Sequence, residues 1–192
     1  MMKKHPLLKV ELTSTVKWSA RDTAEFRRWL QLSSVVWTKL LKQGLLPAAQ
    51  FSHVKVFHLS VLVCGDQRMR NLNSEFRNKN SVTDVLSFPE HQDLRHTKLA
   101  VGPAVLLGDL AICHPQAKKQ AKEFSIGYWD EFIHLLFHGI IHLVGYDHEL
   151  SRKEERLMEK WEGEAIRLLS EAKKRGRTPA PTKRKSIKVS RP

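Results

Sequence analysis

Apolar residues gather in four short segments whose composition and spacing predict β-strands. The segment HVKVFHLSVLV at 53–63 is rich in β-branched and apolar residues, which is typical of a central strand. Three further segments, at 9–17, 84–88 and 105–113, show the same bias. The stretch 89–104 between the last two is polar and contains Pro and Gly, so it predicts a loop.

Helical spacing of apolar residues predicts five helices between and after these strands. The first opens at Ser19 or Asp22 and runs to Gly44, with its apolar positions mostly on one face. Ser151 and Glu154 have the spacing of a capping box at the start of the last helix. The other helices are expected at about 65–76, 114–124, 128–145 and 152–172.

This order of elements predicts one α+β domain, residues 1–172, in which a roughly four-stranded mixed sheet is packed by about five helices. Cys64 and Cys113 lie inside apolar strand segments, so we expect buried thiols in a reducing compartment and no disulfide framework. The first residues lack the continuous apolar core of a signal peptide, and no apolar segment is long enough to span a bilayer. We therefore expect a cytoplasmic protein without membrane contact.

Positive charge is concentrated at the end of the chain. The formal net charge is +13, and residues 173–192 carry nine Lys and Arg and no acids, which leaves +4 for residues 1–172. The segment 173–192 also has three prolines and almost no apolar side chains, so we expect it to be disordered. A basic arm of this kind is predicted to contact nucleic acid. The alternative is a solubilising extension.

Three histidines in HGIIHLVGYDH, residues 138–148, have a spacing that suits a metal site. His138 and His142 are one helical turn apart on one face, and Gly145 suits a left-handed helix cap that brings His148 back to the same side. Three imidazole nitrogens with a fourth position left open are typical of catalytic zinc, so we expect one Zn²⁺ per chain.

His134 is a rival ligand because it lies one turn before His138 on the same face. His134 and His142 are eight residues apart, which at a helical rise of roughly 1.5 Å per residue separates them by about 12 Å along the axis. These two histidines therefore cannot share one ion. We prefer His138, His142 and His148, and expect a packing or supporting role for His134.

Gly139 decides which chemistry the histidines can support. The same spacing occurs in the long metzincin peptidase motif, where a glutamate after the first histidine is the general base. Glycine has no group that accepts a proton, which disfavours peptide hydrolysis by that route. Phosphodiester cleavage depends more on charge stabilisation, which a metal ion supplies.

A second polar segment, LNSEFRNKNSVTDVLSFPE at 72–90, runs into the third predicted strand. Arg77 and Lys79 are candidates for holding a phosphate, Arg by a bidentate fork and Lys as a point charge. By composition alone this signal is weak, because exposed Arg and Lys usually belong to a solvated surface.

Together with the strand LGDLAIC, these two segments resemble the YbeY family of metal-dependent endoribonucleases, over about residues 50–160. The resemblance implies that His138, His142 and His148 bind zinc and that Arg77 faces RNA. It also implies a role in ribosomal RNA maturation and ribosome quality control, with ribosomal RNA and the small ribosomal subunit as partners. Asn80 and Val82 depart from the acidic residue and proline that the family commonly has before TDVLSFP, which affects the local loop shape.

The sequence therefore predicts a zinc-dependent, single-strand-specific endoribonuclease. Arg77, with Lys79, is expected to neutralise the phosphate, and Asp147 either orients an imidazole or caps a turn. His114, after the fourth strand, is a candidate neighbour of the groove. The alternative functions are a non-catalytic, zinc-containing ribosome-assembly factor and a metal-dependent hydrolase of another substrate. The general base is not identified.

Overall fold

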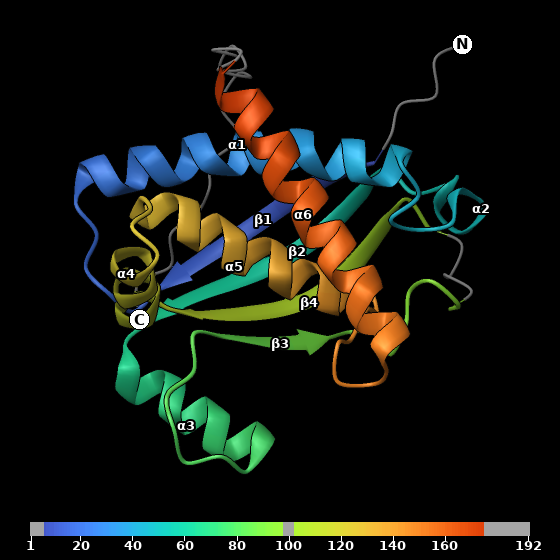
Figure 1. Cartoon of the computed structure of the whole chain (residues 1–192). Coiled ribbons are helices and arrows are strands. Elements are labelled where there is room, and N and C mark those ends of the chain that lie inside the picture. The colour runs from blue at the N-terminus through green and yellow to red at the C-terminus, as the bar shows by residue number, and fades with distance from the viewer. Residues whose placement is uncertain (1–5, 98–101, 175–192) are drawn as a thin grey trace.

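The computed structural model describes residues 6–97 and 102–174 (Figure 1). Most of the expected tail, 173–192, lies outside the described residues, and only its first two positions are within them. The elements in chain order are β1 (Leu7–Ser14), α1 (Ala20–Lys42), α2 (Ala48–Phe51), β2 (Val56–Cys64), α3 (Asp66–Arg77), β3 (Val85–Pro89), β4 (Ala104–Cys113), α4 (His114–Glu123), α5 (Tyr128–Leu143) and α6 (Arg152–Lys174).

The four strands form one mixed sheet in the order β1-β2-β4-β3. β1 and β4 both pair parallel to β2, and the short edge strand β3 pairs antiparallel to β4. Gly108 allows β3 to approach closely, because its φ is +129° and a Cβ there would lie 2.2 Å from the carbonyl oxygen of Phe88. The predicted α+β class, with a four-stranded mixed sheet, is confirmed.

One face of the sheet is covered by α1, α5 and α6 (Figure 1). α5 lies against β3 and β4, and both α1 and α6 pack beside it. Its side chains are apolar on nearly every side, which places the helix inside the core rather than on the surface. The predicted apolar stripe of the first helix is buried here as well, at Phe26, Leu30, Trp37, Leu40 and Leu41.

The opposite face is covered only in part, by α3 at the β3 side of the sheet. Met69 and Leu72 of α3 pack there in a small cluster with Leu86, Ala111 and the two cysteines. Both thiols are free and buried, as predicted, and burial raises the pKa of Cys64 to about 11 and that of Cys113 to about 12. Both cysteines are therefore packing residues.

The ends of several elements differ from the prediction for local reasons. β1 ends at Ser14 instead of residue 17, because the Ser14 hydroxyl hydrogen-bonds both backbone groups of Val16 and turns the chain. The four-residue α2 has too few residues to show helical spacing and was not predicted. Ser19 and Asp22 form a reciprocal capping box for α1.

None of the helices in the described ranges is long and apolar enough to cross a membrane.

Candidate metal centre

The structure brings the three predicted histidines together at the C-terminal end of α5. One ligand nitrogen from each of His138, His142 and His148 lies within 4.8 Å of the others. The ring centroids are 4.8 Å apart for His138 and His142, 5.1 Å for His142 and His148, and 5.8 Å for His138 and His148. Two nitrogens bound to one zinc ion lie at most about 4.2 Å apart, so small side-chain rotations bring all three to a shared ion.

A glycine turn carries His148 back to the helix. Gly145 has a φ of +107°, its amide donates to the carbonyl of His142 at 2.9 Å, and the amide of Tyr146 donates to the carbonyl of Ile141 at 3.2 Å. These two bonds are those of a Schellman motif, which satisfies the last helical carbonyls and reverses the chain. The predicted left-handed cap at Gly145 is confirmed, and it places the third imidazole beside the first two.

The turn is anchored from both sides. The buried Tyr146 donates its hydroxyl to the carbonyl of Leu45 at 2.9 Å, and the Arg95 guanidinium lies 4.3 Å from the centroid of its ring. Arg95 also bridges Asp93 and Glu154, at 2.8 and 2.7 Å. The Glu154 carboxylate is therefore engaged by Arg95, while its amide keeps the predicted bond to Ser151. This packing fixes the turn that carries His148.

Glu162 on α6 is a site residue that the sequence pattern did not reveal. Its Oε1 lies 2.7 Å from Nδ1 of His138, which makes Nδ1 the donor and leaves Nε2 of that ring free for an ion. Burial raises the pKa of Glu162, but the hydrogen bond from His138 and the nearby imidazoles lower it more, so the carboxylate is ionised. α6 follows the ligand turn directly, and only its packing against α5 shows that this glutamate faces His138.

The environment of the cluster suits metal binding on two counts. Burial lowers the pKa of His142 to about 4, with further lowering by His138 and His148, so this imidazole is neutral at pH 7 and able to ligate. His148 is exposed, and the His138 side chain is 27% exposed. The cluster therefore opens to solvent on one side, where a substrate can approach.

His134 lies outside the cluster, as predicted. Its Nδ1 is 3.6 Å from Oε2 of the buried Glu131, one turn earlier on α5. Asp147 accepts from the amide of Glu149 at 2.9 Å, so it caps the turn. His114 contacts the hydroxyl of Tyr128 at 2.7 Å, at the far end of α5 from His142. The structure therefore places His114 away from the metal cluster.

The packing of α5 explains why glycine occupies position 139. A Cβ on Gly139 would lie 2.6 Å from Cδ2 of the buried Leu110 and 3.3 Å from Oγ of Ser87. A side chain there would have to displace the buried Leu110 side chain or push α5 away from β3 and β4. A glutamate in the manner of the zinc peptidases would therefore disturb this packing, and the glycine that stands here points to chemistry other than theirs.

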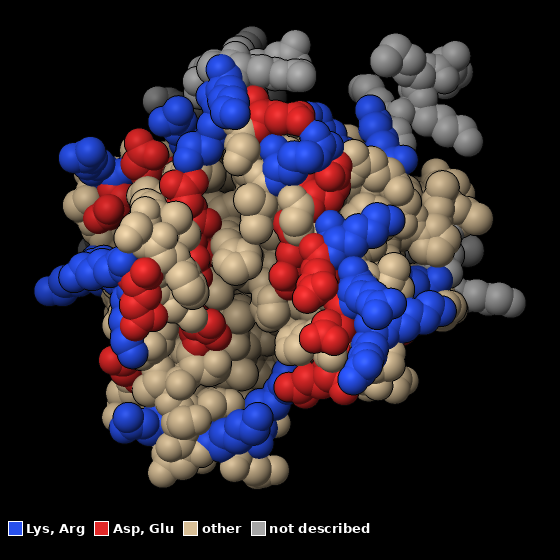
Figure 2. Space-filling model, viewed as in Figure 1, with Lys and Arg blue, Asp and Glu red and all other residues tan. Residues whose placement is uncertain are grey.

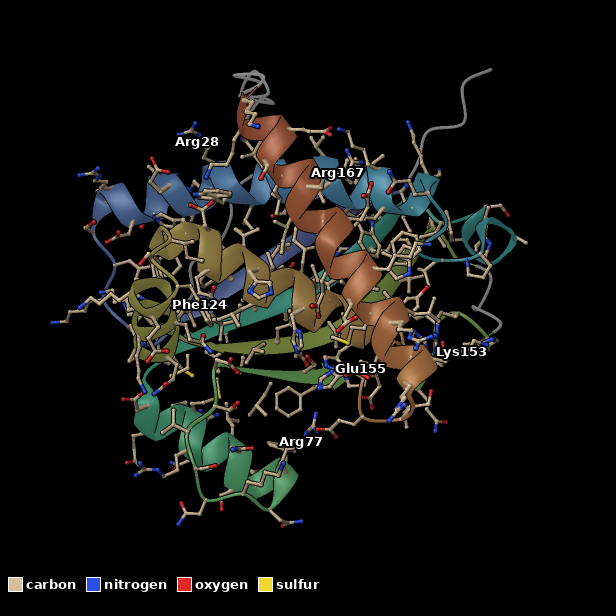
Figure 3. All side chains as sticks on the ribbon, in the orientation of Figure 1. Arg28, Arg77, Phe124, Lys153, Glu155 and Arg167 are labelled. Atoms are coloured by element: carbon tan, nitrogen blue, oxygen red, sulfur yellow. The ribbon has the colours of Figure 1, made fainter. Side chains whose placement is uncertain are left out.

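Arg77 and Lys79 are exposed at the C-terminal end of α3 and just beyond it, with Asn78 in the left-handed conformation between them (Figure 3). They lie on the α3 side of β3, whereas the histidines lie on the α5 side. Figure 2 shows Lys and Arg side chains at the lower edge, where α3 lies, and near the start of α6, where Arg152, Lys153 and Arg156 are exposed. Acidic side chains stand among the basic ones near the start of α6, so the basic groups that suit a polyanion are those at α3 (Figure 2).

Comparisons with known proteins agree with this geometry. A family model described as "Endoribonuclease YbeY" matches residues 24–170. A protein of that name from Thermodesulfovibrio yellowstonii is 44% identical over 104 residues, which cover 54% of this chain and 62% of the relative. Another, from Persephonella marina, is 37% identical over 120 residues, which cover 62% of this chain and 75% of the relative. The chain thus matches less than two thirds of the length of the first relative.

The fold also matches a solved structure. A protein of Thermotoga maritima, determined in solution, superposes with a TM-score of 0.54 at 20% identity, covering 92% of this chain and all of the other. At this identity the match supports the fold alone. The arrangement of a mixed sheet with helices on its faces is therefore shared beyond the relatives of similar sequence.

Proposed function

The chain belongs to the YbeY endoribonuclease family, and from this membership we propose that it is a zinc-dependent endoribonuclease that cleaves single-stranded RNA. The observation that carries the proposal is the cluster of His138, His142 and His148, whose ligand nitrogens lie within 4.8 Å of one another at a face open to solvent. The basic residues at α3 supply the charge that an RNA strand needs.

Zinc is the ion that suits this donor set. The three candidate ligands are imidazoles, and three nitrogens with an open fourth position are typical of catalytic zinc, whereas structural sites close the shell with four protein ligands. When bound, the ion would polarise a phosphate oxygen and lower the pKa of a bound water. The protein's part is to present the rings in a ligating form and orientation: burial keeps His142 neutral, and the hydrogen bond to Glu162 orients the His138 ring with Nε2 toward the ion.

Arg77 is the residue to which we assign stabilisation of the scissile phosphate. Its planar guanidinium can donate two parallel hydrogen bonds to phosphate oxygens, and Lys79, two residues further on, adds a second positive charge. Both are exposed and lie across β3 from the histidines, so an RNA strand lying over that edge can meet both groups. For catalysis, the RNA strand has to cross β3, from Arg77 on the α3 side to the histidines on the α5 side.

We further propose a cellular role in ribosomal RNA maturation and ribosome quality control, with the small ribosomal subunit as partner, in the cytoplasm. This assignment rests on the family and on the positive charge of the chain. The division into a catalytic domain, 1–172, and a basic tail, 173–192, is part of the proposal. α6 continues to Lys174, and Lys173 is held by Asp130 at 2.6 Å, so the part of the tail free to reach RNA starts after these contacts.

The test is a metal analysis combined with RNA cleavage for the wild type and His142→Ala. We expect about one zinc ion per wild-type chain and cleavage of single-stranded RNA, both lost in the variant. Absence of any bound transition metal, even after reconstitution, would remove the central claim. Tight RNA binding by the zinc-loaded wild type without cleavage would identify a non-catalytic assembly factor instead.

A further inference from the structure

A pocket of about 380 Å³ lies on the α3 side of the sheet, outside the metal cluster. Its floor is formed by side chains of the two central strands, including Leu62 and Ala111. Leu72 and Phe76 of α3 form one wall, and Phe88 of β3 closes the side nearest the sheet edge. The pocket is large enough for one planar ring system and is mainly apolar.

Two aromatic rings form the mouth of this pocket. Phe76 and Phe88 meet edge to face, with centroids 5.0 Å apart and an interplanar angle of 72°. Phe76 is 55% exposed, so part of its ring is accessible to a ligand. Arg77 follows it directly in the chain. An exposed ring with a guanidinium beside it is the pairing with which single-strand-binding proteins stack a base and hold its phosphate.

Polar groups interrupt the apolar lining at a few points. Thr13, Ser60 and Asp109 reach the pocket from three neighbouring strands. Asp109 is exposed, and its carboxylate is able to accept hydrogen bonds from the N–H groups on the edge of a base. A mainly apolar pocket with a few polar groups that fix orientation is the usual form of a small-molecule subsite.

β3 lies between this pocket and the metal cluster. Successive residues of a strand point to opposite faces, so Ser87 faces α5 and Phe88 faces α3. Ser87 Oγ lies 3.3 Å from where a Cβ of Gly139 would be, and Gly139 follows the ligand His138. The metal cluster and the pocket are therefore separated by one edge strand, and a flexible single strand can cross it.

We propose that this pocket binds one unstacked base of the single-stranded RNA substrate, next to the nucleotide whose phosphate reaches the metal centre. The ring of Phe76 stacks on the base, Asp109 accepts from its edge, and Arg77 holds the backbone between the two sites. The inference rests on the proposed function, since it names a substrate subsite for that same reaction. It also gives a reason for single-strand specificity, because a paired base cannot enter the pocket.

A base fits the pocket better than a protein segment does. A stable protein interface buries on the order of 1,000 Å² or more, which a pocket for one ring does not supply. The charge beside the opening is positive at Arg77 and Lys79, which complements a phosphodiester backbone.

The test compares Phe76→Ala with Phe124→Ala, each as the zinc-loaded full chain. Phe124 is 62% exposed at the end of α4, on another part of the surface, so it controls for loss of an exposed ring (Figure 3). Affinity is measured by fluorescence anisotropy for a short single-stranded RNA and for the same RNA with abasic positions, on a time scale short compared with cleavage, and gels check that the RNA is still intact. We expect Phe76→Ala to weaken binding about fivefold to a hundredfold, from the cost of losing one stacked base.

The effect of Phe76→Ala should disappear on the RNA whose base is missing at the pocket position, and Phe76→Tyr should bind as the wild type does. Zinc content and melting temperature, measured alongside, should match the wild type in all three variants. Unchanged affinity in Phe76→Ala, or an equal loss on intact and abasic RNA, overturns the base pocket while leaving RNA cleavage in place. A wild-type protein that neither binds nor cleaves RNA overturns the proposed function itself.

Discussion

The two faces of the sheet are built in different ways. On one face α5 is enclosed by α1, α6 and the sheet, and His142 is fixed between buried apolar residues of the same helix. On the other face α3 covers only the β3 side, and its exposed end presents Phe76, Arg77 and Lys79. The enclosed face holds the histidine cluster, and the open face holds the groups we assign to RNA.

This difference shows how one small domain can separate two demands. Metal ligands need fixed geometry and a low proton affinity, and burial supplies both for His142. A long, flexible polyanion needs accessible charge and aromatic surface, which an incompletely covered face provides. Substitutions on the enclosed face should therefore change metal binding, and those on the open face should change RNA handling alone.

The largest effect expected from this division between the two faces is the difference between His138→Ala and His134→Ala. The two residues are one turn apart on α5, but only His138 belongs to the cluster. His138→Ala should lose the metal, RNA cleavage and part of its stability, since binding at such a site is coupled to folding. His134→Ala should keep the metal, as shown by elemental analysis and thermal melting. An empty site in His134→Ala with a full one in His148→Ala would reverse the ligand assignment.

Arg77→Ala should affect the open face alone. We expect the single-turnover cleavage rate to fall on the order of a hundredfold, by analogy with removal of one preorganised donor from an oxyanion site. Arg77→Lys should recover only part of this loss, because an ammonium group lacks the planar fork. Zinc content and melting temperature should stay at wild-type values. Arg28→Ala, an exposed arginine on α1, is the matched control (Figure 3).

If Arg77→Ala cleaves as fast as the wild type, the catalytic role of Arg77 is wrong. If its whole defect is in RNA affinity, Arg77 is a binding residue only. Both outcomes are read from cleavage and affinity measured on the same RNA, so the rate and binding effects are separated.

Glu162→Gln tests whether the enclosed face orients its ligands through α6. The amide keeps the shape of the side chain but removes the charge that pairs with Nδ1 of His138. Loss of such an outer partner typically costs about tenfold to a hundredfold in metal affinity, so we expect weaker zinc binding in a competition titration. Glu155→Gln, exposed on the same helix, should bind zinc normally (Figure 3). Equal affinities for the two variants would reduce Glu162 to a packing residue.

Deleting residues 175–192 should have the smallest effect on the folded domain. The deleted segment carries seven of the nine Lys and Arg of the tail and has almost no apolar side chains, so the melting temperature should barely move. The truncation keeps Lys173, which pairs with Asp130. RNA affinity should fall and depend less steeply on salt, because fewer counterions are released. An unchanged salt slope would show that this segment does not contact RNA.

Local patterns along the chain were enough to predict every helix and strand except α2, and to predict which three histidines lie together. The spacing of His138 and His142 places two rings on one helical face, and Gly145 provides the turn that returns His148, because both depend only on backbone geometry within a few residues. The order of strands and helices likewise predicted an α+β domain with a mixed sheet. The short α2 was missed because four residues cannot show a helical period.

Three features of the molecule follow only from the tertiary structure, because they depend on contacts between elements distant in sequence. The pairing of Glu162 with His138, the lack of room beside Gly139 and the pocket between Phe76 and Phe88 all follow from how α5, α6 and α3 lie against the sheet. Those positions are set by the summed burial of many side chains, so no short motif encodes them. Spacing therefore determined which side chains form the candidate metal cluster, whereas packing determined how they are oriented and where the pocket lies that we assign to the substrate.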